Sequence, residues 1–409
     1  MTTADISKVG TAVDGRAAAR VDSAPPKIVG RSVKLDALRG VAILLVLGRH
    51  QRIDPSAAGA LSAPAALWQR FGWTGVDLFF VLSGFLVGGL LLKEILKFGN
   101  LHPSRFLVRR GLKIWPSYYV YLGWVAVRKL WIDSSTTSAH FADVWHSLWP
   151  SVFNVQNYFW LIRPHLWSLG VEEHFYLFLP LMLLCFARTR ALLAKRRVLV
   201  GLISVLVGCL FLRSITGDIA DFQNRYYTHL RLDSLAFGFL LAYLFHVRPM
   251  WWKKLAERRN LLLVFGLLAV APAAILPYPS RLLGSVGLTS LYVGYGAILV
   301  ACVSESAEPH WLDRVLKGWM GRCLAFVGFS SYSIYLWHID IGGEAAKAVK
   351  PFLFAQHAEL HWICVTAVFA LTAIAGGILI GRAVEMPVLH FRDRLFPART
   401  GLTTPRLNH

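Results

Sequence analysis

Long apolar segments recur along the whole chain, and each is close to the length of a membrane-spanning helix. A helix needs about 20 consecutive apolar residues to cross the hydrocarbon core of a bilayer. Ten such segments are expected at 35–52, 73–97, 107–131, 166–187, 198–215, 231–248, 261–277, 282–303, 323–343 and 360–382. Only 16% of the residues are charged, whereas soluble domains have about 25%. The sequence therefore predicts an all-α, multi-pass membrane protein with one large domain.

The basic residues follow the order of these expected spans. The net charge of +20 would suggest nucleic-acid binding in a soluble protein. Here, however, 31 of the 43 Lys and Arg fall in alternate connecting segments, beginning with the N-terminal one. Cytoplasmic segments of membrane proteins carry such an excess. We therefore expect both termini in the cytoplasm, basic segments in contact with anionic membrane lipids, and no nucleic-acid partner.

Three regions follow from composition. Residues 1–33 are polar, contain Ala, Ser and Pro, and lack the apolar stretch of a signal peptide, so we expect a disordered cytoplasmic tail. Residues 397–409 are interpreted as a second tail, which leaves 34–396 as the transmembrane domain. The five cysteines are scattered through apolar segments without metal-ligand spacing, so they are expected to pack and no metal site is predicted.

The longest expected external loop, 132–165, is rich in aromatic residues. Its members are Trp145, Trp149, Phe153, Tyr158, Phe159 and Trp160. Trp and Tyr concentrate where the membrane meets water. We expect this loop to lie at that interface or to re-enter the membrane.

The first expected span has charged residues at both ends, with Asp36 and Arg39 at one end and Arg49 and His50 at the other. A charged group at the bilayer centre costs about 2.5–3.5 kcal/mol on insertion scales, so such groups face a protein interior or a wet cavity. Arg39 and His50 are eleven residues apart, which places them about 20° apart around a helix and about 16 Å apart along it. This predicts one face with a cation at the cytoplasmic end and an imidazole above it, both directed into one cavity. Alternatively, Arg39 is a snorkelling anchor and His50 an interfacial residue.

The second and third spans also contain unusual residues. Asp77 lies near the outer end of the second span, where Gly84 and Gly88 form a GxxxG pair typical of close helix packing. The third span opens with three cations within about one helical turn, Arg109, Arg110 and Lys113. They are either ordinary cytoplasmic anchors or a phosphate clamp, since Arg matches phosphate oxygens with two hydrogen bonds.

Polar groups enter three further spans from the outer side. The fourth opens with Glu172, Glu173 and His174, and only one of the adjacent carboxylates can face a cavity squarely. The sixth begins with Arg231 and Asp233, which could simply pair with each other. The ninth contains Tyr332, Trp337 and His338, and this histidine could simply belong to an interfacial aromatic belt.

Taken in order, these segments resemble the acyltransferase-3 family of integral-membrane O-acyltransferases. The matching segments are Leu35–Gly40 with His50, Gly75–Phe85, Arg109–Pro116, Trp167–Tyr176, Arg231 with Asp233, Ser331–His338 and Glu385–Pro387. The order makes the resemblance specific, and it covers residues 34–396. The chain differs from the usual family pattern at Arg49, Lys113, His174 and Met386.

The resemblance implies transfer of an acyl group, often acetyl, from cytoplasmic acyl-coenzyme A in the bacterial inner membrane. Acyl-coenzyme A is a co-substrate, and no bound cofactor is implied. Typical acceptors are hydroxyls of cell-surface polysaccharides, lipo-oligosaccharides or peptidoglycan, and a minority branch acylates small molecules such as macrolides. The essential residues of the family correspond to Arg39, His50, the basic cluster and Glu172.

Our hypothesis from the sequence places the coenzyme A phosphates near the basic cluster and Arg39. His50 then acts as general base on the acceptor hydroxyl, because an imidazole gains and loses a proton near neutral pH. Glu172 is expected to orient this histidine. A secondary transporter would also bury charged groups along a pathway, but it would more often show internal repeats, and none is visible.

Overall fold

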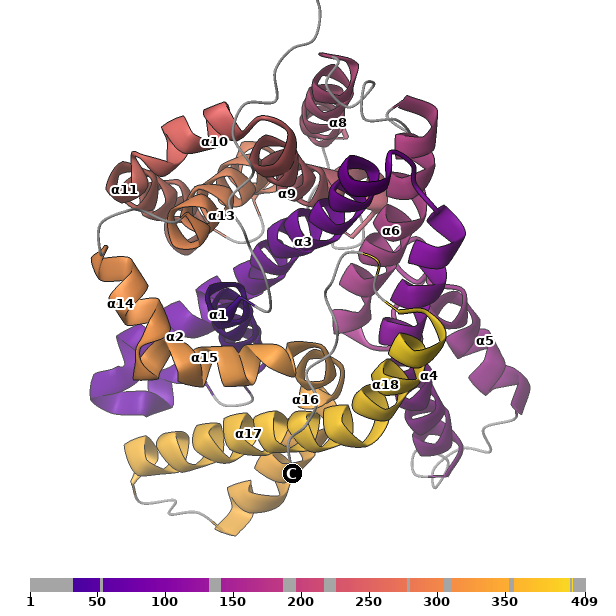
Figure 1. Cartoon of the computed structure of the whole chain (residues 1–409). Coiled ribbons are helices and arrows are strands. Elements are labelled where there is room, and N and C mark those ends of the chain that lie inside the picture. The colour runs from indigo at the N-terminus through magenta and orange to yellow at the C-terminus, as the bar shows by residue number, and fades with distance from the viewer. Residues whose placement is uncertain are drawn as a thin grey trace, which may run out of the picture.

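The computed structural model describes residues 32–51, 54–131, 141–186, 196–216, 226–277, 280–304, 310–352, 357–397 and 399. Within these ranges every regular element is helical, which confirms the predicted all-α class. The tails predicted at 1–33 and 397–409 lie outside the described residues, apart from 32–33, 397 and 399. Figure 1 shows the helices gathered into one bundle, with α8 at one edge and α17 at another.

Each predicted span overlaps a long helix. These helices are α1 (Val33–His50), α3 (Gly75–Phe98), α4 (Pro103–Trp131), α6 (Trp167–Phe186), α8 (Arg196–Ile215), α9 (Thr228–Val247), α11 (Arg259–Val270), α13 (Leu288–Val303), α16 (Ser331–Val349) and α17 (Ala358–Ile380). Shorter helices connect them: α2 (Ser62–Phe71), α5 (Phe141–Val152), α10 (Pro249–Ala256), α12 (Pro272–Ile275), α14 (Trp311–Lys317), α15 (Trp319–Phe329) and α18 (Met386–Leu395). Short 3₁₀-helical segments lie at η1 (Pro55–Leu61), η2 (Gly72–Thr74), η4 (Pro164–Leu166) and η7 (Lys350–Phe352), and short π-helical segments at η6 (Leu283–Gly287) and η8 (Gly381–Glu385).

Six helical stretches in the described residues are long and apolar enough to cross a membrane. A seventh is added if α10 and the α11–α12 segment, which are bent by 81°, form one broken span. Helices α1, α4 and α16 are not among them, because they contain charged side chains. The chain is thus a multi-pass membrane protein, while ten spans and cytoplasmic termini remain predictions.

Peripheral helices expose their apolar side chains. Val200, Val207 and Phe211 on α8 are 58%, 58% and 61% exposed, and Leu371 on α17 is 66% exposed. In water such a surface would be unfavourable, whereas acyl chains of a bilayer cover it without cost. These faces are therefore the lipid contacts of the bundle.

The ninth predicted span is wrong in one respect, because the structure divides it at Ser330 into α15 and α16. Helix α15 crosses α1 closely, since a Cβ on Gly40 would lie 2.1 Å from the Leu324 carbonyl oxygen and one on Gly328 only 1.8 Å from that of Asp36. Figure 1 shows α15 crossing α1 while α16 turns away in another direction. This close crossing, available only to glycine, fixes α15 against α1, and the chain then changes direction at Ser330.

The predicted close packing at Gly84 and Gly88 is confirmed. A Cβ on Gly84 would lie 2.0 Å from the Leu235 carbonyl oxygen, and one on Gly88 would lie 2.3 Å from the Phe239 ring. From the other side, a Cβ on Gly238 would lie 2.2 Å from the Val81 carbonyl oxygen. Helices α3 and α9 therefore touch along their backbones, which fixes the polar residues at their outer ends.

The aromatic segment before α6 forms a short helix and an irregular stretch. Residues 132–140 of the predicted loop lie outside the described residues. Helix α5 has 12 residues, too few to cross a bilayer of about 30 Å. Trp145 and Phe153 are 49% and 64% exposed, whereas the Tyr118 hydroxyl ties the segment to α4 by donating to the Ser151 carbonyl oxygen at 2.8 Å.

Candidate functional site

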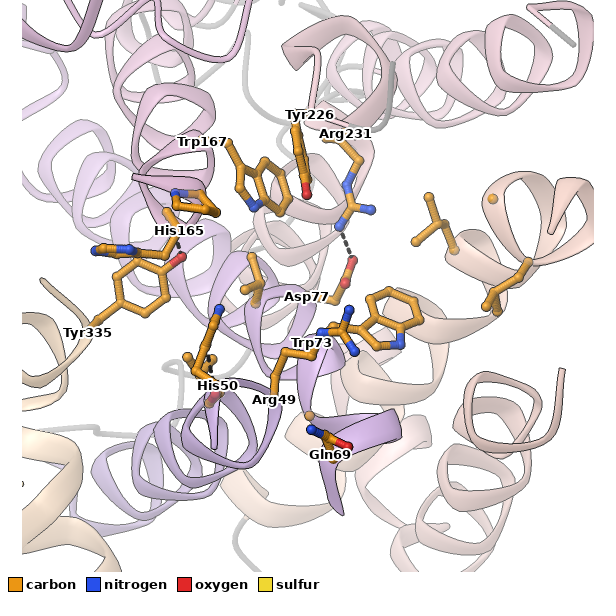
Figure 2. A pocket seen from close by; sticks show the side chains of 17 residues that line it. Arg49, His50, Gln69, Trp73, Asp77, His165, Trp167, Tyr226, Arg231 and Tyr335 are labelled. Carbon is orange, nitrogen blue, oxygen red and sulfur yellow. Dashed lines mark hydrogen bonds and ion pairs between the residues drawn. The ribbon is translucent and has the colours of Figure 1, made fainter. Parts of the chain in front are cut away.

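Two adjacent cavities collect most of the residues singled out from the sequence. The larger, about 430 Å³, contains His50 and His165 and is called the histidine cavity (Figure 2). The smaller, about 100 Å³, contains Arg39, Arg110 and Lys113 and is called the cationic cavity. Both are lined by Val76 and Tyr335, so these two residues form the wall between them.

His50 ends α1, and its Nδ1 has two close neighbours. Its Nδ1 lies 3.0 Å from the Val46 carbonyl oxygen and 3.2 Å from Nε2 of His338. A carbonyl oxygen only accepts hydrogen bonds, so Nδ1 carries the hydrogen and Nε2 of a neutral His50 carries the lone pair. Figure 2 shows the His50 ring standing up from α1 into the cavity.

His338 is oriented in the same manner. It is fully buried on α16, and its Nδ1 donates to the Tyr335 carbonyl oxygen at 2.7 Å. Its Nε2 is therefore an acceptor, and the one Nδ1–H of His50 is shared between this nitrogen and the Val46 carbonyl oxygen. The two rings lie 4.9 Å apart between centroids. The arrangement can hold His50 in one tautomer and stabilise its protonated form.

His165 completes a histidine cluster that sequence reasoning missed. It lies in η4, is 2% exposed, and its Nε2 is 3.1 Å from the Leu336 carbonyl oxygen. Its ring centroid is 5.2 Å from that of His338. In the sequence, the position of His165 directly before the Trp167–Tyr176 segment could have indicated it as a candidate site residue.

The cationic cavity brings three predicted cations together with carboxylates. Arg39, Arg110 and Lys113 line it with Glu172, Glu173 and Glu385. Arg110 lies 3.9 Å from Glu172 and 4.0 Å above the Tyr176 ring. The Tyr176 hydroxyl is hydrogen-bonded to Ser83 and to Glu172. The lining therefore combines three cations from α1 and α4 with three carboxylates, and its guanidinium and ammonium groups are the ones able to bind phosphate oxygens.

Two sequence expectations differ from the structure. Arg109 lies outside the cavity lining and pairs at 3.0 Å with Asp393 on α18. Glu172, expected beside His50, lies instead in the cationic cavity with Arg110, and His338 occupies the position next to His50. Both differences arise from helix packing: α18 approaches one side of α4, and α16 rather than α6 meets the end of α1.

The idea that Arg231 and Asp233 pair with each other is wrong. Arg231 pairs with Asp77 at 2.7 Å, and Asp233 pairs with Arg213 of α8 at the same distance. All four side chains are buried, and a buried charge is stable only with a well-placed partner. Asp77 and Arg231 also line the histidine cavity.

The remaining predicted residues support these walls. The Tyr332 hydroxyl donates to the Ile114 carbonyl oxygen at 3.0 Å, and Trp337 packs edge-on against Tyr121 at 5.0 Å. His174 contacts the Thr228 hydroxyl at 2.6 Å, and Glu173 accepts from the Trp115 indole at 3.2 Å.

Two other carboxylates bind Arg residues nearby. Asp36 lies 3.5 Å from Arg39. Asp340, which sequence reasoning missed, accepts from Tyr121 at 2.6 Å, Arg163 at 3.0 Å and Arg128 at 3.2 Å. Asp340 therefore ties the segment before α6 to α4 and α16.

Comparison with known proteins adds independent findings. Residues 32–382 match the model of the acyltransferase-3 family, described as an acyltransferase domain. A protein of Staphylococcus aureus (strain COL) named "Putative O-acetyltransferase" is 27% identical over 344 residues, which cover 75% of this chain and 50% of the relative. The peptidoglycan O-acetyltransferase OatA of Listeria monocytogenes is 28% identical over 329 residues, which cover 75% of this chain and 49% of the relative. The chain thus spans about half the length of these relatives. No solved structure matches it.

Proposed function

Because the chain belongs to the acyltransferase-3 family of membrane O-acyltransferases, we propose that it moves an acetyl group from cytoplasmic acetyl-coenzyme A to a hydroxyl of a cell-surface saccharide. The site of action is the bacterial plasma membrane. The observation that supports this most is the pair of cavities separated by Val76 and Tyr335. One is suited to an anionic donor, and the other contains a base.

The donor enters the cationic cavity. Arg39 and Arg110 bind phosphate oxygens through paired N–H groups, and Lys113 adds a point charge. The long pantetheine arm of coenzyme A then extends toward Val76 and Tyr335. This brings the thioester to the boundary with the histidine cavity, where His50 lies.

The acceptor enters the histidine cavity and is activated by His50. The Nε2 lone pair takes the proton of the acceptor hydroxyl as its oxygen bonds to the thioester carbonyl carbon. The carbon–sulfur bond then breaks, and the leaving sulfur takes the proton back from His50. The products are an acetyl ester and free coenzyme A, so atoms and charge balance. General base catalysis of this kind contributes about 10²–10⁴-fold in rate.

His338 is assigned the orienting role that the sequence hypothesis gave to Glu172. It accepts the Nδ1–H of His50 and stabilises the positive charge that forms when Nε2 is protonated. Glu172 instead holds Arg110 and Tyr176 in place. A saccharide acceptor is favoured over a small molecule, because the Listeria relative is named for peptidoglycan.

The test uses purified protein in lipid nanodiscs with acetyl-coenzyme A and a soluble peptidoglycan oligosaccharide. We expect free thiol and acetyl ester to appear in equal amounts, and only when the acceptor is present. The same oligosaccharide with its hydroxyls methylated is the matched control. Thiol release that does not depend on acceptor hydroxyls would contradict acyl transfer to a saccharide.

A further inference from the structure

The histidine cavity is too small for more than a short piece of a saccharide chain. Its volume is about 430 Å³, whereas pockets for small-molecule ligands range over about 300–1,000 Å³. A cavity at the small end of this range holds about one or two sugar rings. Because the proposed acceptor is part of a cell-surface saccharide, the rest of its chain lies outside the cavity. The surface at the mouth of the cavity therefore faces the neighbouring sugars of that chain.

Aromatic side chains lead from the cavity wall to the surface. Tyr226 lines the histidine cavity and is 8% exposed, and its ring stacks on Trp167 with 4.7 Å between centroids (Figure 2). Tyr227, the next residue, is partly exposed and has an extended backbone directly before the first turn of α9. Successive side chains of an extended segment point in opposite directions. The boundary between the cavity wall and the surface therefore falls between Tyr226 and Tyr227.

Tyr227 belongs to a cluster of three rings, formed with Tyr158 and His229 and called the aromatic platform. The ring centroids of Tyr158 and Tyr227 are 5.2 Å apart, and those of His229 lie 5.8 Å from Tyr158 and 5.5 Å from Tyr227. The three interplanar angles are 5°, 25° and 26° in the same order. Three similar distances describe a triangle rather than a column, so the rings are displaced sideways and their faces are roughly parallel. The platform is accessible, since Tyr158 is 39% exposed and His229 is exposed as well.

Hydrogen bonds hold the platform in place. The buried Asn157 side chain donates from Nδ2 to the Tyr226 carbonyl oxygen at 3.0 Å and to the Thr228 hydroxyl oxygen at 2.9 Å. The Tyr158 hydroxyl lies 3.1 Å from Nδ1 of His229. These contacts join the segment before α6 to the start of α9. An aromatic residue of a membrane interface needs only its contact with the lipid headgroups, whereas a rigid, preorganised surface favours ligand binding.

We propose that the aromatic platform is a second saccharide subsite, which binds a sugar unit next to the one acetylated in the histidine cavity. The C–H faces of a sugar ring are apolar and pack on flat aromatic faces, while its hydroxyls reach the polar ends of the tyrosine side chains. The protein therefore prefers a long saccharide chain to a short one. This inference rests on the proposed function and adds a preference for the length of the acceptor.

The test compares a disaccharide and a hexasaccharide of peptidoglycan, which share their sugars and linkages and differ in length. With purified protein in lipid nanodiscs and saturating acetyl-coenzyme A, the ratio of kcat/KM between the hexasaccharide and the disaccharide is measured. We expect the wild type to favour the hexasaccharide. Tyr158→Leu and Tyr227→Leu remain apolar but lose the flat ring, so each should lower the ratio by about fivefold, equivalent to about 1 kcal/mol.

Two further variants separate ring stacking from other roles. Tyr158→Trp keeps a flat aromatic face and should keep most of the ratio. Phe153→Leu is the matched control, because Phe153 is a 64% exposed aromatic residue of the same segment that lies outside the platform. An unchanged ratio in both leucine variants of the platform, an equal decrease in Phe153→Leu, or a wild type without preference for the hexasaccharide would overturn the subsite. Failure of the wild type to acetylate either saccharide would instead overturn the proposed function.

Discussion

Nε2 of His338 lies 3.2 Å from Nδ1 of His50, although 288 positions separate the two residues in the chain. Helix α16 meets the end of α1 at this point, and the Val46 and Tyr335 carbonyl oxygens fix the hydrogen on Nδ1 of each ring. The pair therefore directs the basic Nε2 of His50 away from His338. Protonation of that nitrogen makes the His50 ring a cation, and the Nε2 lone pair of His338 beside its Nδ1–H can stabilise this charge.

Replacing His50 by Gln tests the base directly. Gln keeps hydrogen-bonding capacity but cannot take up a proton at neutral pH. We expect His50→Gln to insert normally, to bind acetyl-coenzyme A, and to lose about a hundredfold or more in kcat. Donor binding is measured by calorimetry on nanodiscs. Loss of thiol release together with retained donor binding would support this role. Near-normal turnover would rule His50 out as the base.

His338→Gln tests the orienting role. Because His338 acts through His50, we expect a smaller loss in kcat, about ten- to a hundredfold, with little change in the KM for the donor. The double variant His50→Gln/His338→Gln should be about as slow as His50→Gln alone, since residues that act as a unit are not additive. His310→Gln, whose Nε2 contacts Asn260 at 3.1 Å on an exposed surface, is the control. Fully additive losses would indicate that His338 has only a packing role.

Local helix geometry predicted only part of the environment of α1. Arg39 and His50 both line cavities, but the single shared cavity that their spacing of eleven residues suggested is wrong, because Val76 and Tyr335 lie between the cavity of Arg39 and that of His50. Hydropathy placed the helices well, because apolar length is a local property. It failed at Ser330, because a change of helix direction inside an apolar stretch does not alter the hydropathy of that stretch.

Partners of charged residues could not be predicted from the sequence. Asp340 joins Tyr121 and Arg163, which lie 219 and 177 positions earlier, and Arg109 meets Asp393 across 284 positions. Adjacent residues such as Arg231 and Asp233 suggested a local pair, yet successive helix residues point about 100° apart and reach different neighbours. Long-range packing therefore decides which charges define a site.

The distribution of basic residues predicts the orientation of the chain in the membrane. Since 31 of the 43 Lys and Arg lie on one predicted side, we expect both termini in the cytoplasm. The orientation is measured with reporter proteins fused at residues 20 and 400. One kind of reporter is active only in the cytoplasm, and the other only outside it. An external signal from either end would contradict an even number of spans with this orientation.

Asp313 should support stability in a pH-dependent way. It lies on α14, 2.6 Å from Lys34 and 2.8 Å from Arg259, which are themselves buried. Burial raises the pKa of the Asp313 carboxyl, but hydrogen bonds from Arg259 and Lys34 outweigh it and hold that pKa below its ordinary value. The pKa of the Asp313 carboxyl is lower in the folded protein than in the unfolded one. The stabilisation of the fold by this carboxylate is therefore complete above about pH 4 and is lost as the pH falls below that.

Asp313→Asn should lower the free energy of unfolding by about 3–5 kcal/mol at neutral pH, because two buried cations lose their partner. Thermal unfolding in detergent at several pH values measures this, and the gap from wild type should narrow in acid. The control is Lys347→Met, since the Lys347–Glu344 pair is 55% and 47% exposed and should contribute about 0–1 kcal/mol. An equal loss in both variants would contradict a special role for the buried network.

The donor site gives a comparison between neighbouring arginines. Arg110 lines the cationic cavity, whereas Arg109 pairs with Asp393 outside it. We expect Arg110→Gln and Lys113→Met each to raise the KM for acetyl-coenzyme A by about tenfold or more, because charged hydrogen bonds contribute about 1.5–3 kcal/mol. Arg109→Gln should lower thermal stability through its lost partner on α18, with much less effect on this KM. Donor titrations on correctly inserted variants decide between these expectations. If Arg109→Gln weakens the donor as strongly as Arg110→Gln, phosphate binding extends beyond the cationic cavity, and its three cations do not define the donor site.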